Sequence, residues 1–163
     1  MASSTAHTIL LTVNDEHRPI FEHEANEAIT PGELLAFDAD DELIPHGTAG
    51  GNAQAIFAVE DPYNGDTTAA AIDTDYATGE QVRVVYGQSG DVIYAFCPTG
   101  QTIAKGDPLE SDGVGGLRKH TPISADAGGS GTYTFYARAI VAFAAEDKTN
   151  SSGSRARIRV RVA

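Results

Sequence analysis

The fold is decided by the stretch ITPGELLAFDADDELIPH at residues 29–46, because residues 103–120 repeat it without a gap as IAKGDPLESDGVGGLRKH. Six of the eighteen positions are identical, among them a glycine, two leucines, a turn aspartate and the final histidine. Such self-similarity indicates an internal duplication, which has to be recognised before a fold is assigned. We therefore expect the chain to fold as two similar halves.

The similarity extends beyond these stretches to the end of each half. Residues 55–61 return at 139–147 with two extra residues, and the strand pattern of 79–85 returns at 157–162. Each unit therefore reads strand, turn, strand, strand, loop, strand, which gives internal repeats at 29–87 and 103–163. A stacked solenoid needs about three repeats to bury its faces, so we expect the two units to close on each other into one small β-barrel.

The strand pattern predicts an all-β protein with a single barrel domain. Alternating or β-branched runs bounded by Gly, Pro, Asn or Asp predict strands at 8–13, 55–60, 81–86, 92–96, 133–144 and 155–162. A helical turn is plausible only at 22–28 and 69–72. Neither segment sustains a helical period, so no longer helix is expected. We expect residues 29–163 to form the barrel. Residues 1–28 lie outside the duplication and are expected to form an extended N-terminal arm.

The charge balance limits the partners that this chain can bind. It carries 23 Asp and Glu against 11 Lys and Arg, which gives a formal net charge of −12. An acidic surface disfavours nucleic acid, which is recognised through basic footprints. The apolar run at residues 9–11 is too short to cross a membrane. Scarce lysine and abundant aspartate resemble proteins of halophilic organisms, and an acidic protein of a mesophile is the alternative.

No motif in the sequence carries catalytic or cofactor chemistry, so we expect a protein that is not an enzyme and needs no cofactor or metal. The acidic loop 38–42 lacks the spacing and the distal glutamate of an EF-hand. His17 and His23 lie among acidic residues that could supply metal ligands, and a solvated arm is the preferred interpretation. His46 and His120 are equivalent in the two repeats, so a shared metal or proton site is conceivable. The preferred interpretation is a partly exposed histidine at the end of each hairpin strand.

The last predicted strand has a strong charge pattern. Arg155, Arg157, Arg159 and Arg161 alternate with apolar residues, so a period of two places four guanidinium groups on one face. This face is predicted to be an interface that docks on the acidic surface of a neighbouring copy. The alternative, a strand whose arginines pair with carboxylates of the same chain, fits the pattern equally well.

A resemblance to a known family rests on residues 31–35 with Ala55 and Ile56, and on residues 103–109 with 137–140. With the closing strand of arginine and valine, they resemble the small all-β head decoration, or cement, proteins of tailed phages and archaeal tailed viruses. The resemblance implies a small β-barrel that assembles as a homotrimer on the outer capsid surface. It also implies that the protein clamps subunits of the major capsid protein, often through extended arms. A structural virion protein is therefore predicted.

The glycine-aspartate hairpin at 103–109 also resembles the hairpins of β-clip and barrel-sandwich modules. That resemblance implies a binding module for a sugar, or a carrier with a lysine-linked cofactor. Lys119 lies near the end of a hairpin but lacks the flanking methionines of a biotin-carrier site. A location on the tail of a virion, in place of the head, is a further alternative.

Overall fold

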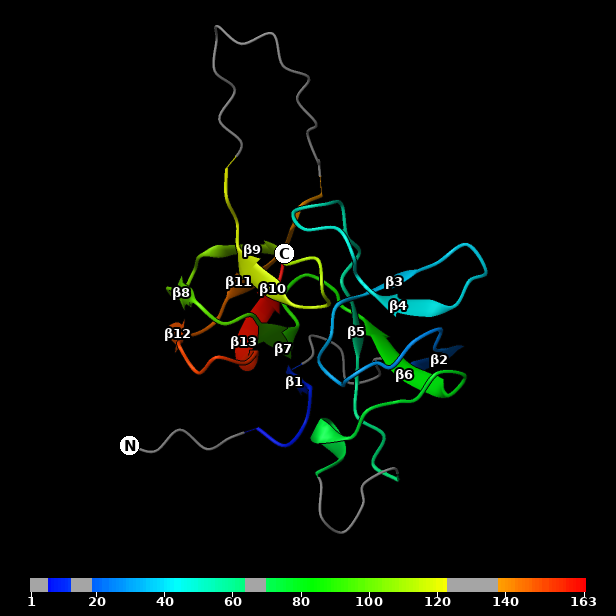
Figure 1. Cartoon of the computed structure of the whole chain (residues 1–163). Coiled ribbons are helices and arrows are strands. Elements are labelled where there is room, and N and C mark those ends of the chain that lie inside the picture. The colour runs from blue at the N-terminus through cyan, green and yellow to red at the C-terminus, as the bar shows by residue number, and fades with distance from the viewer. Residues whose placement is uncertain (1–5, 13–18, 64–69, 123–137) are drawn as a thin grey trace, which may run out of the picture.

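The computed structural model describes residues 6–12, 19–63, 70–122 and 138–163, and these residues form an all-β protein, as predicted (Figure 1). Its strands are β1 (Leu10–Thr12), β2 (Phe21–Glu24), β3 (Leu35–Phe37), β4 (Leu43–Pro45), β5 (Ile56–Ala58), β6 (Gln81–Tyr86), β7 (Val92–Cys97), β8 (Gln101–Ile103), β9 (Pro108–Ser111), β10 (Leu117–Lys119), β11 (Ile140–Ala144), β12 (Lys148–Asn150) and β13 (Ala156–Val162). A 3-10 turn, η1 (Ala71–Asp73), is the only helical element in these ranges. Residues 133–137 of the predicted strand 133–144 lie outside them.

The strands pair into open sheets. One sheet has six strands in the order β1-β7-β13-β11-β9-β10, and another has three in the order β2-β6-β5. The hairpin β3-β4 and the pair β8-β12 form two smaller sheets. The prediction of a closed barrel is therefore wrong for the part of the chain that the structure describes, because each sheet ends in edge strands that do not pair with each other.

The two repeated stretches form hairpins with the same register. Leu35 pairs with Pro45 in the first hairpin, and Leu109 pairs with Lys119, its counterpart, in the second. The turn aspartate explains why the loops match. Its Oδ1 accepts the N–H groups two and four residues later, at 2.9 and 3.0 Å for Asp38 and at 2.8 Å in both cases for Asp112. The aspartate of the acidic loop thus stabilises a turn.

The matching register extends to the other strands. Ala58 of β5 pairs with Val84 of β6, and Ala144 of β11 pairs with Val160 of β13. In the same way β2 pairs with β6, and β7 pairs with β13. We call β2–β6 the first unit and β7–β13 the second unit; Figure 1 shows them on opposite sides of the molecule. The matched pairings begin earlier in the chain than residues 29 and 103, at β2 and β7.

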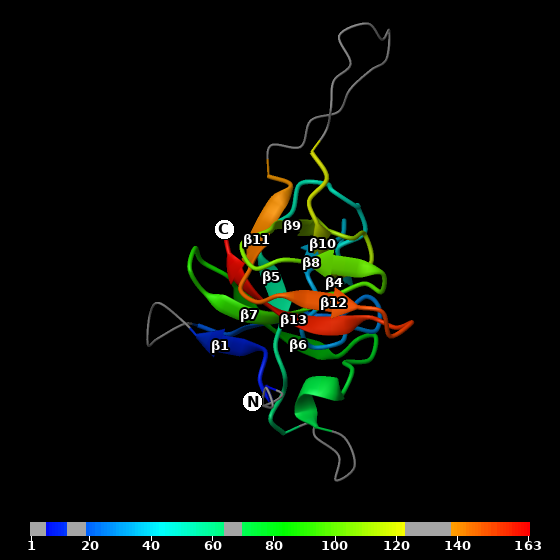
Figure 2. The ribbon, with the colours of Figure 1, turned by 90° about the vertical axis from the view of Figure 1, so that its left-hand side faces the viewer.

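Part of the expected N-terminal arm belongs to the sheets. Strand β1 pairs with β7 at the edge of the six-stranded sheet, where Figure 2 shows the two side by side, and β2 pairs with β6. Ile9 and Ala25 are buried, at 0% and 1% exposure. The description of residues 1–28 as an arm is therefore corrected for residues 9–12 and 21–25, which are held by backbone pairing and apolar burial. The segment 22–28 supplies a strand where a helical turn was plausible.

The two units have separate cores that meet through one shared surface. All side chains in the core of the first unit belong to that unit. The core of the second unit also contains five residues from the span of the first unit. One is Ile72 of η1, and we call the other four the junction face: Leu34, Phe57, Val59 and Val85. Successive side chains of a strand point to opposite faces, so Ile56 and Ala58 fill the first core while Phe57 enters the second.

Two partly buried aspartates should make stability fall in acid. The amide of Asn26 and nearby backbone N–H groups hold the pKa of Asp38 below its usual 3.8. The ammonium of Lys119, with Nζ 2.7 Å from Oδ2, lowers the pKa of Asp107. Each contribution to stability is complete above the unfolded-state value and is lost as the pH falls through the lower folded-state pKa. We expect an Asp38→Asn/Asp107→Asn double variant to lose less stability than the parent protein in that pH range. Denaturant titrations at several pH values measure the free energy of unfolding, and the same pH dependence in both proteins would contradict this.

Candidate functional site

Strand β13 has the two faces that the sequence predicts. Ile158, Val160 and Val162 are at most 4% exposed in the core of the second unit. Because side chains alternate along a strand, the four arginines lie on the opposite face. The role of each guanidinium group therefore depends on its own surroundings.

Arg157 anchors β13 to the rest of the fold. Its side chain is 12% exposed and forms an ion pair with Asp73. It also donates to the carbonyl of Ile72 in η1, and to the carbonyl of Pro31 at 3.0 Å. Its Cζ lies 4.4 Å from the ring centroid of Phe96 on the neighbouring strand. One partly buried cation thus connects β13, β7, η1 and the turn before β3.

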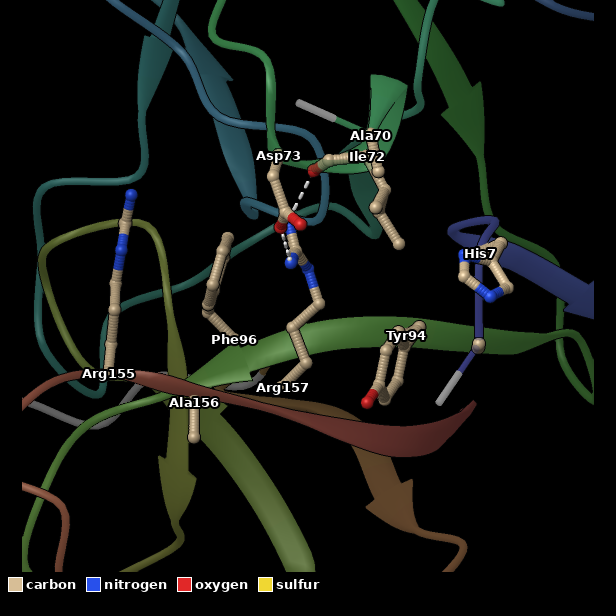
Figure 3. Close-up of a pocket in the computed structure, with 10 residues that line it drawn as sticks. His7, Ala70, Ile72, Asp73, Tyr94, Phe96, Arg155, Ala156 and Arg157 are labelled. Carbon is tan, nitrogen blue, oxygen red and sulfur yellow. Dashed lines mark hydrogen bonds and ion pairs between the residues drawn. The ribbon is translucent and has the colours of Figure 1, made fainter. Parts of the chain in front are cut away.

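Arg155 covers the other side of the same aromatic ring. Its Cζ lies 4.3 Å from the centroid of Phe96, so this ring lies between two guanidinium groups, as Figure 3 shows. Arg155 forms an ion pair with Glu33 and donates to Thr30 Oγ1 at 2.8 Å. Burial raises the pKa of the Glu33 carboxyl, and the bonds to Arg155 and to the Thr30 N–H oppose that shift. Arg155 therefore stabilises the ionised form of a buried first-unit carboxylate.

A pocket of about 390 Å³ opens beside these arginines (Figure 3). Asp73 and Arg157 line it together with Tyr94 and His7. The terminal nitrogens of Arg157 are bound to the protein, and its Nε is buried without a hydrogen-bond partner among the described residues. The polar lining of the pocket therefore serves the contacts within the chain and leaves few donors for a ligand.

The remaining arginines differ from each other. Nη1 of Arg159 lies 3.6 Å from Oε2 of Glu146, and the backbone N–H of Arg159 donates to the same carboxylate at 3.0 Å. Arg161 is exposed and has no ion-pair partner within the described segments. It lies across from Phe143 on β11 and from Val92 on β7. Of the four arginines, Arg161 has the surroundings of a residue that is available to a partner.

The structure therefore divides the predicted interface residues. Local pairing, which was the alternative, describes Arg155, Arg157 and Arg159, whose partners belong to the same chain. Nothing in the structure tests a role of the arginine face in docking, and that role stays a prediction that now centres on Arg161. The partners of Arg155 and Arg157 were not predictable from the strand pattern, since they lie 122 and 84 positions away in sequence.

Single substitutions should separate an anchoring arginine from an available one. We expect Arg157→Ala to lower the free energy of unfolding by about 2–3 kcal/mol, because charge-assisted hydrogen bonds are lost from a partly buried site. Arg161→Ala, on the same strand face, should change it by less than about 0.5 kcal/mol. Denaturant titrations extrapolated to low protein concentration measure both values. Equal losses for the two variants would contradict the anchoring role of Arg157.

The two equivalent histidines have different surroundings. His46 is 6% exposed, with Nδ1 2.8 Å from Ser111 Oγ and Nε2 3.0 Å from the carbonyl oxygen of Asn52. His120 is half-buried, and its Nδ1 lies 2.5 Å from Oε2 of Glu110. The expectation of a partly exposed histidine is wrong for His46, because the loop after β4 and the second hairpin cover it. The duplication therefore does not give the two rings a shared site.

One pair of side chains resembles a catalytic arrangement but is closed to solvent. Ser111 and His46 form a pair that resembles a nucleophile and its base, but Ser111 is 0% exposed. Within the same residues no three His, Cys, Asp or Glu side chains are grouped so that they could hold a metal ion. His17 lies outside them, so its proposed pairing with His23 is untested. No helix in the described ranges is long and apolar enough to span a membrane.

The lysine of the carrier alternative lies in a strand and is paired. Lys119 belongs to β10, and its Nζ lies 2.7 Å from Oδ2 of Asp107. Its backbone N–H donates to Gln101 Oε1 at 3.2 Å. A carrier lysine needs a free hairpin tip, and the structure places Lys119 at the far end of the β9-β10 hairpin from its turn.

A second surface was missed by sequence reasoning. Phe21 is 44% exposed, and its ring meets that of Tyr86 edge-on with centroids 5.1 Å apart. His23 Nε2 lies 3.2 Å from the Tyr86 hydroxyl. These side chains line a largely apolar hollow of about 540 Å³, which we call the aromatic hollow: Pro19, Phe21, His23, Tyr86 and Gln88. The alternation of Phe21 to Glu24 was the available signal, and the surrounding glutamates concealed it.

Taken together, the fold and these surfaces define an all-β protein with two similar open units and with exposed apolar and cationic positions. Among solved structures, the chain is similar to the N base of the head fiber protein gp8.5 of bacteriophage phi29. The two are 13% identical with a TM-score of 0.52, and the match covers 90% of this chain and 95% of the other. No family model and no curated protein matches the sequence. At this identity the similarity shows a shared fold.

Proposed function

We propose that this chain is a structural virion protein that decorates the outside of an icosahedral viral head. The observation that supports this most directly is the fold shared with a phage head fiber base over nearly the whole of both chains. The proposal agrees with the cement-protein resemblance of residues 31–35 and 103–109, which was derived from the sequence independently. A head-associated protein of this kind acts through its surfaces and needs no reacting groups.

The proposed mechanism is clamping of neighbouring subunits of the major capsid protein. A homotrimer would present each contact three times, and linked contacts bind far more tightly than single ones. Exposed aromatic and arginine side chains, which are typical of interface centres, lie on this chain at Phe21, Phe143 and Arg161, where they are available for the contacts between copies that build such a trimer. The net charge of −12 suits a virion in concentrated salt, where repulsion between copies is screened.

Reconstitution on heads tests this function. Heads of the virus that encodes this chain are stripped of the protein and mixed with purified protein over a range of salt concentrations. Co-sedimentation should show saturable binding, and the reconstituted heads should resist heat or osmotic shock better than the stripped ones. An unrelated folded protein of similar negative charge is the control. Absence of binding at every salt concentration, or binding to tails alone, would refute a head decoration role.

A further inference from the structure

The two units repeat the same pairings but differ in what covers their outer faces. The junction face of the first unit is at most 4% exposed, because it packs on the core of the second unit. The second unit has an equivalent face, since Phe143 pairs with Arg161 as Phe57 pairs with Val85. There, however, Phe143 is 42% exposed and Arg161 is exposed. The same architectural surface is buried in one unit and open in the other.

The turn glycines show the same difference. The N–H of Gly32 donates to Ala58 and that of Gly106 to Ala144, both at 2.8 Å, so the two turns are equivalent. A Cβ added to Gly32 would lie 2.9 Å from the carbonyl oxygen of Tyr94 in the second unit, whereas a Cβ added to Gly106 would meet nothing within 4 Å. We call the open surface of the second unit the free face: Gly106, Pro108, Phe143 and Arg161.

The first unit carries the counterpart of the surface that receives the junction face. Ile93 and Val162 of the second unit belong to the same core cluster as the junction face and are 0% and 4% exposed. The register assigns their positions in the first unit to Phe21 and Tyr86. These two residues line the aromatic hollow, and no described segment of the chain fills it. One chain therefore has an unused donor surface and an unused acceptor surface of the same type.

We propose that the free face of one copy packs into the aromatic hollow of the next, as the junction face packs on the second unit within the chain. The contact is head to tail, because the two surfaces are different. Such contacts form a closed ring when the rotation between copies closes, and otherwise an open filament. The inference rests on the proposed function in one respect: it assigns the contact surface of the proposed homotrimer.

The charges around the two surfaces favour a second copy as the occupant. Lys105 precedes Gly106 at the border of the free face. Gly32 is the counterpart of Gly106, and within the chain its carbonyl oxygen accepts a hydrogen bond from the N–H of Phe96 at 3.3 Å. In the register of the two units, Phe96 corresponds to Glu24. Lys105 of one copy would therefore approach the exposed Glu24 of the next. This attraction offsets repulsion between copies of an acidic protein.

The head-to-tail character gives a specific test. Phe143→Glu damages only the free face, and Phe21→Glu damages only the aromatic hollow. In sedimentation experiments we expect the parent to be trimeric and each variant alone to be monomeric, with association weakened at least about a hundredfold by an unpaired carboxylate in an apolar contact. In an equimolar mixture, the intact free face of a Phe21→Glu copy can pack into the intact hollow of a Phe143→Glu copy. The mixture should therefore form complexes of two copies that grow no further, since the remaining face and the remaining hollow are both damaged. Val114→Glu, at a 67% exposed position outside both surfaces, should stay trimeric.

Circular dichroism and thermal unfolding of each variant confirm that the monomer is folded. If a variant is unfolded, the charge reversals Lys105→Glu and Glu24→Lys replace it, and only their combination should restore the trimer. Trimers in either single Phe variant, or a mixture that stays monomeric, would overturn the inference. If the unsubstituted protein binds heads but stays monomeric at all concentrations, the head-to-tail contact is overturned and the proposed function is left intact. A trimer that never binds heads supports the contact and contradicts the proposed function.

Discussion

Replacing Phe57 by alanine is expected to lower the free energy of unfolding by about 3–5 kcal/mol. Phe57 is 0% exposed on β5, and it is the largest side chain of the junction face. Its loss leaves a cavity where the two units meet, and rigid strands on both sides limit how far the cavity can collapse. Equilibrium denaturation followed by intrinsic tyrosine fluorescence measures the effect.

The matched control is Tyr63→Ala, because Tyr63 is an aromatic residue of the same unit that is 94% exposed. Its removal should change the free energy of unfolding by less than about 0.5 kcal/mol. A second feature of the denaturation curve is informative for Phe57→Ala. Since the first unit completes the core of the second, both should still unfold together or the second should unfold first. A variant in which only the first unit melts would contradict the described junction.

Substituting Gly32 by alanine should be the second most damaging single change. Gly32 has a φ of +98°, which L side chains rarely adopt, and strain of this kind costs about 1–3 kcal/mol. The new Cβ would also stand 2.9 Å from the backbone carbonyl oxygen of Tyr94, which cannot rotate away as a side chain can. We expect the two effects together to lower the midpoint of denaturation more than backbone strain alone would.

Gly100→Ala separates the two contributions. Gly100 has a φ of +80° and no heavy atom within 4 Å of an added Cβ, so this variant shows strain without the close contact. The difference between the two variants measures how tightly the turn before β3 packs on β7. If both lose the same stability, the approach of Gly32 to the second unit is looser than the structure shows.

Much of the local structure could be predicted from the sequence. The strand predicted at 81–86 coincides with β6 (Gln81–Tyr86), and both repeated stretches form hairpins. These elements were predictable because alternation, turn aspartates and glycines act over a few residues. Strand β2 was missed because three of its four residues are charged or titratable, so its single exposed aromatic residue gave no apolar face.

The closure of the sheets could not be predicted, and the reason is physical. Alternation tells which side of a strand faces a core, but it does not tell which edges pair. Here the first hairpin forms a small sheet of its own, and the second hairpin extends the six-stranded sheet. The first unit covers the second core through Phe57, so the apolar faces are buried without barrel closure. The duplication predicted the parts of the fold and not the way in which they combine.

The candidate site was predictable in its chemistry and not in its partners. Period two correctly indicated that Arg157, Arg159 and Arg161 share one face of β13, with Arg155 directly before the strand. The residues that neutralise Arg155 and Arg157 come from distant parts of the chain. Pairing of Arg155 with Glu33 and of Arg157 with Asp73 depends on how the units are joined. The aromatic hollow has the same origin, because its exposure depends on how the units are joined, and none of the described segments covers it.

The position of β13 also determines when the molecule can fold during synthesis. It lies between β7 and β11 in the interior of the six-stranded sheet, whereas the first unit is complete at residue 86. The first unit can therefore pair its strands while the ribosome is still translating the second. The six-stranded sheet has to wait for residues 156–162, so β7 and β11 stay without the strand that lies between them until that segment has emerged. During that interval the nascent second unit is the segment that most needs protection from aggregation.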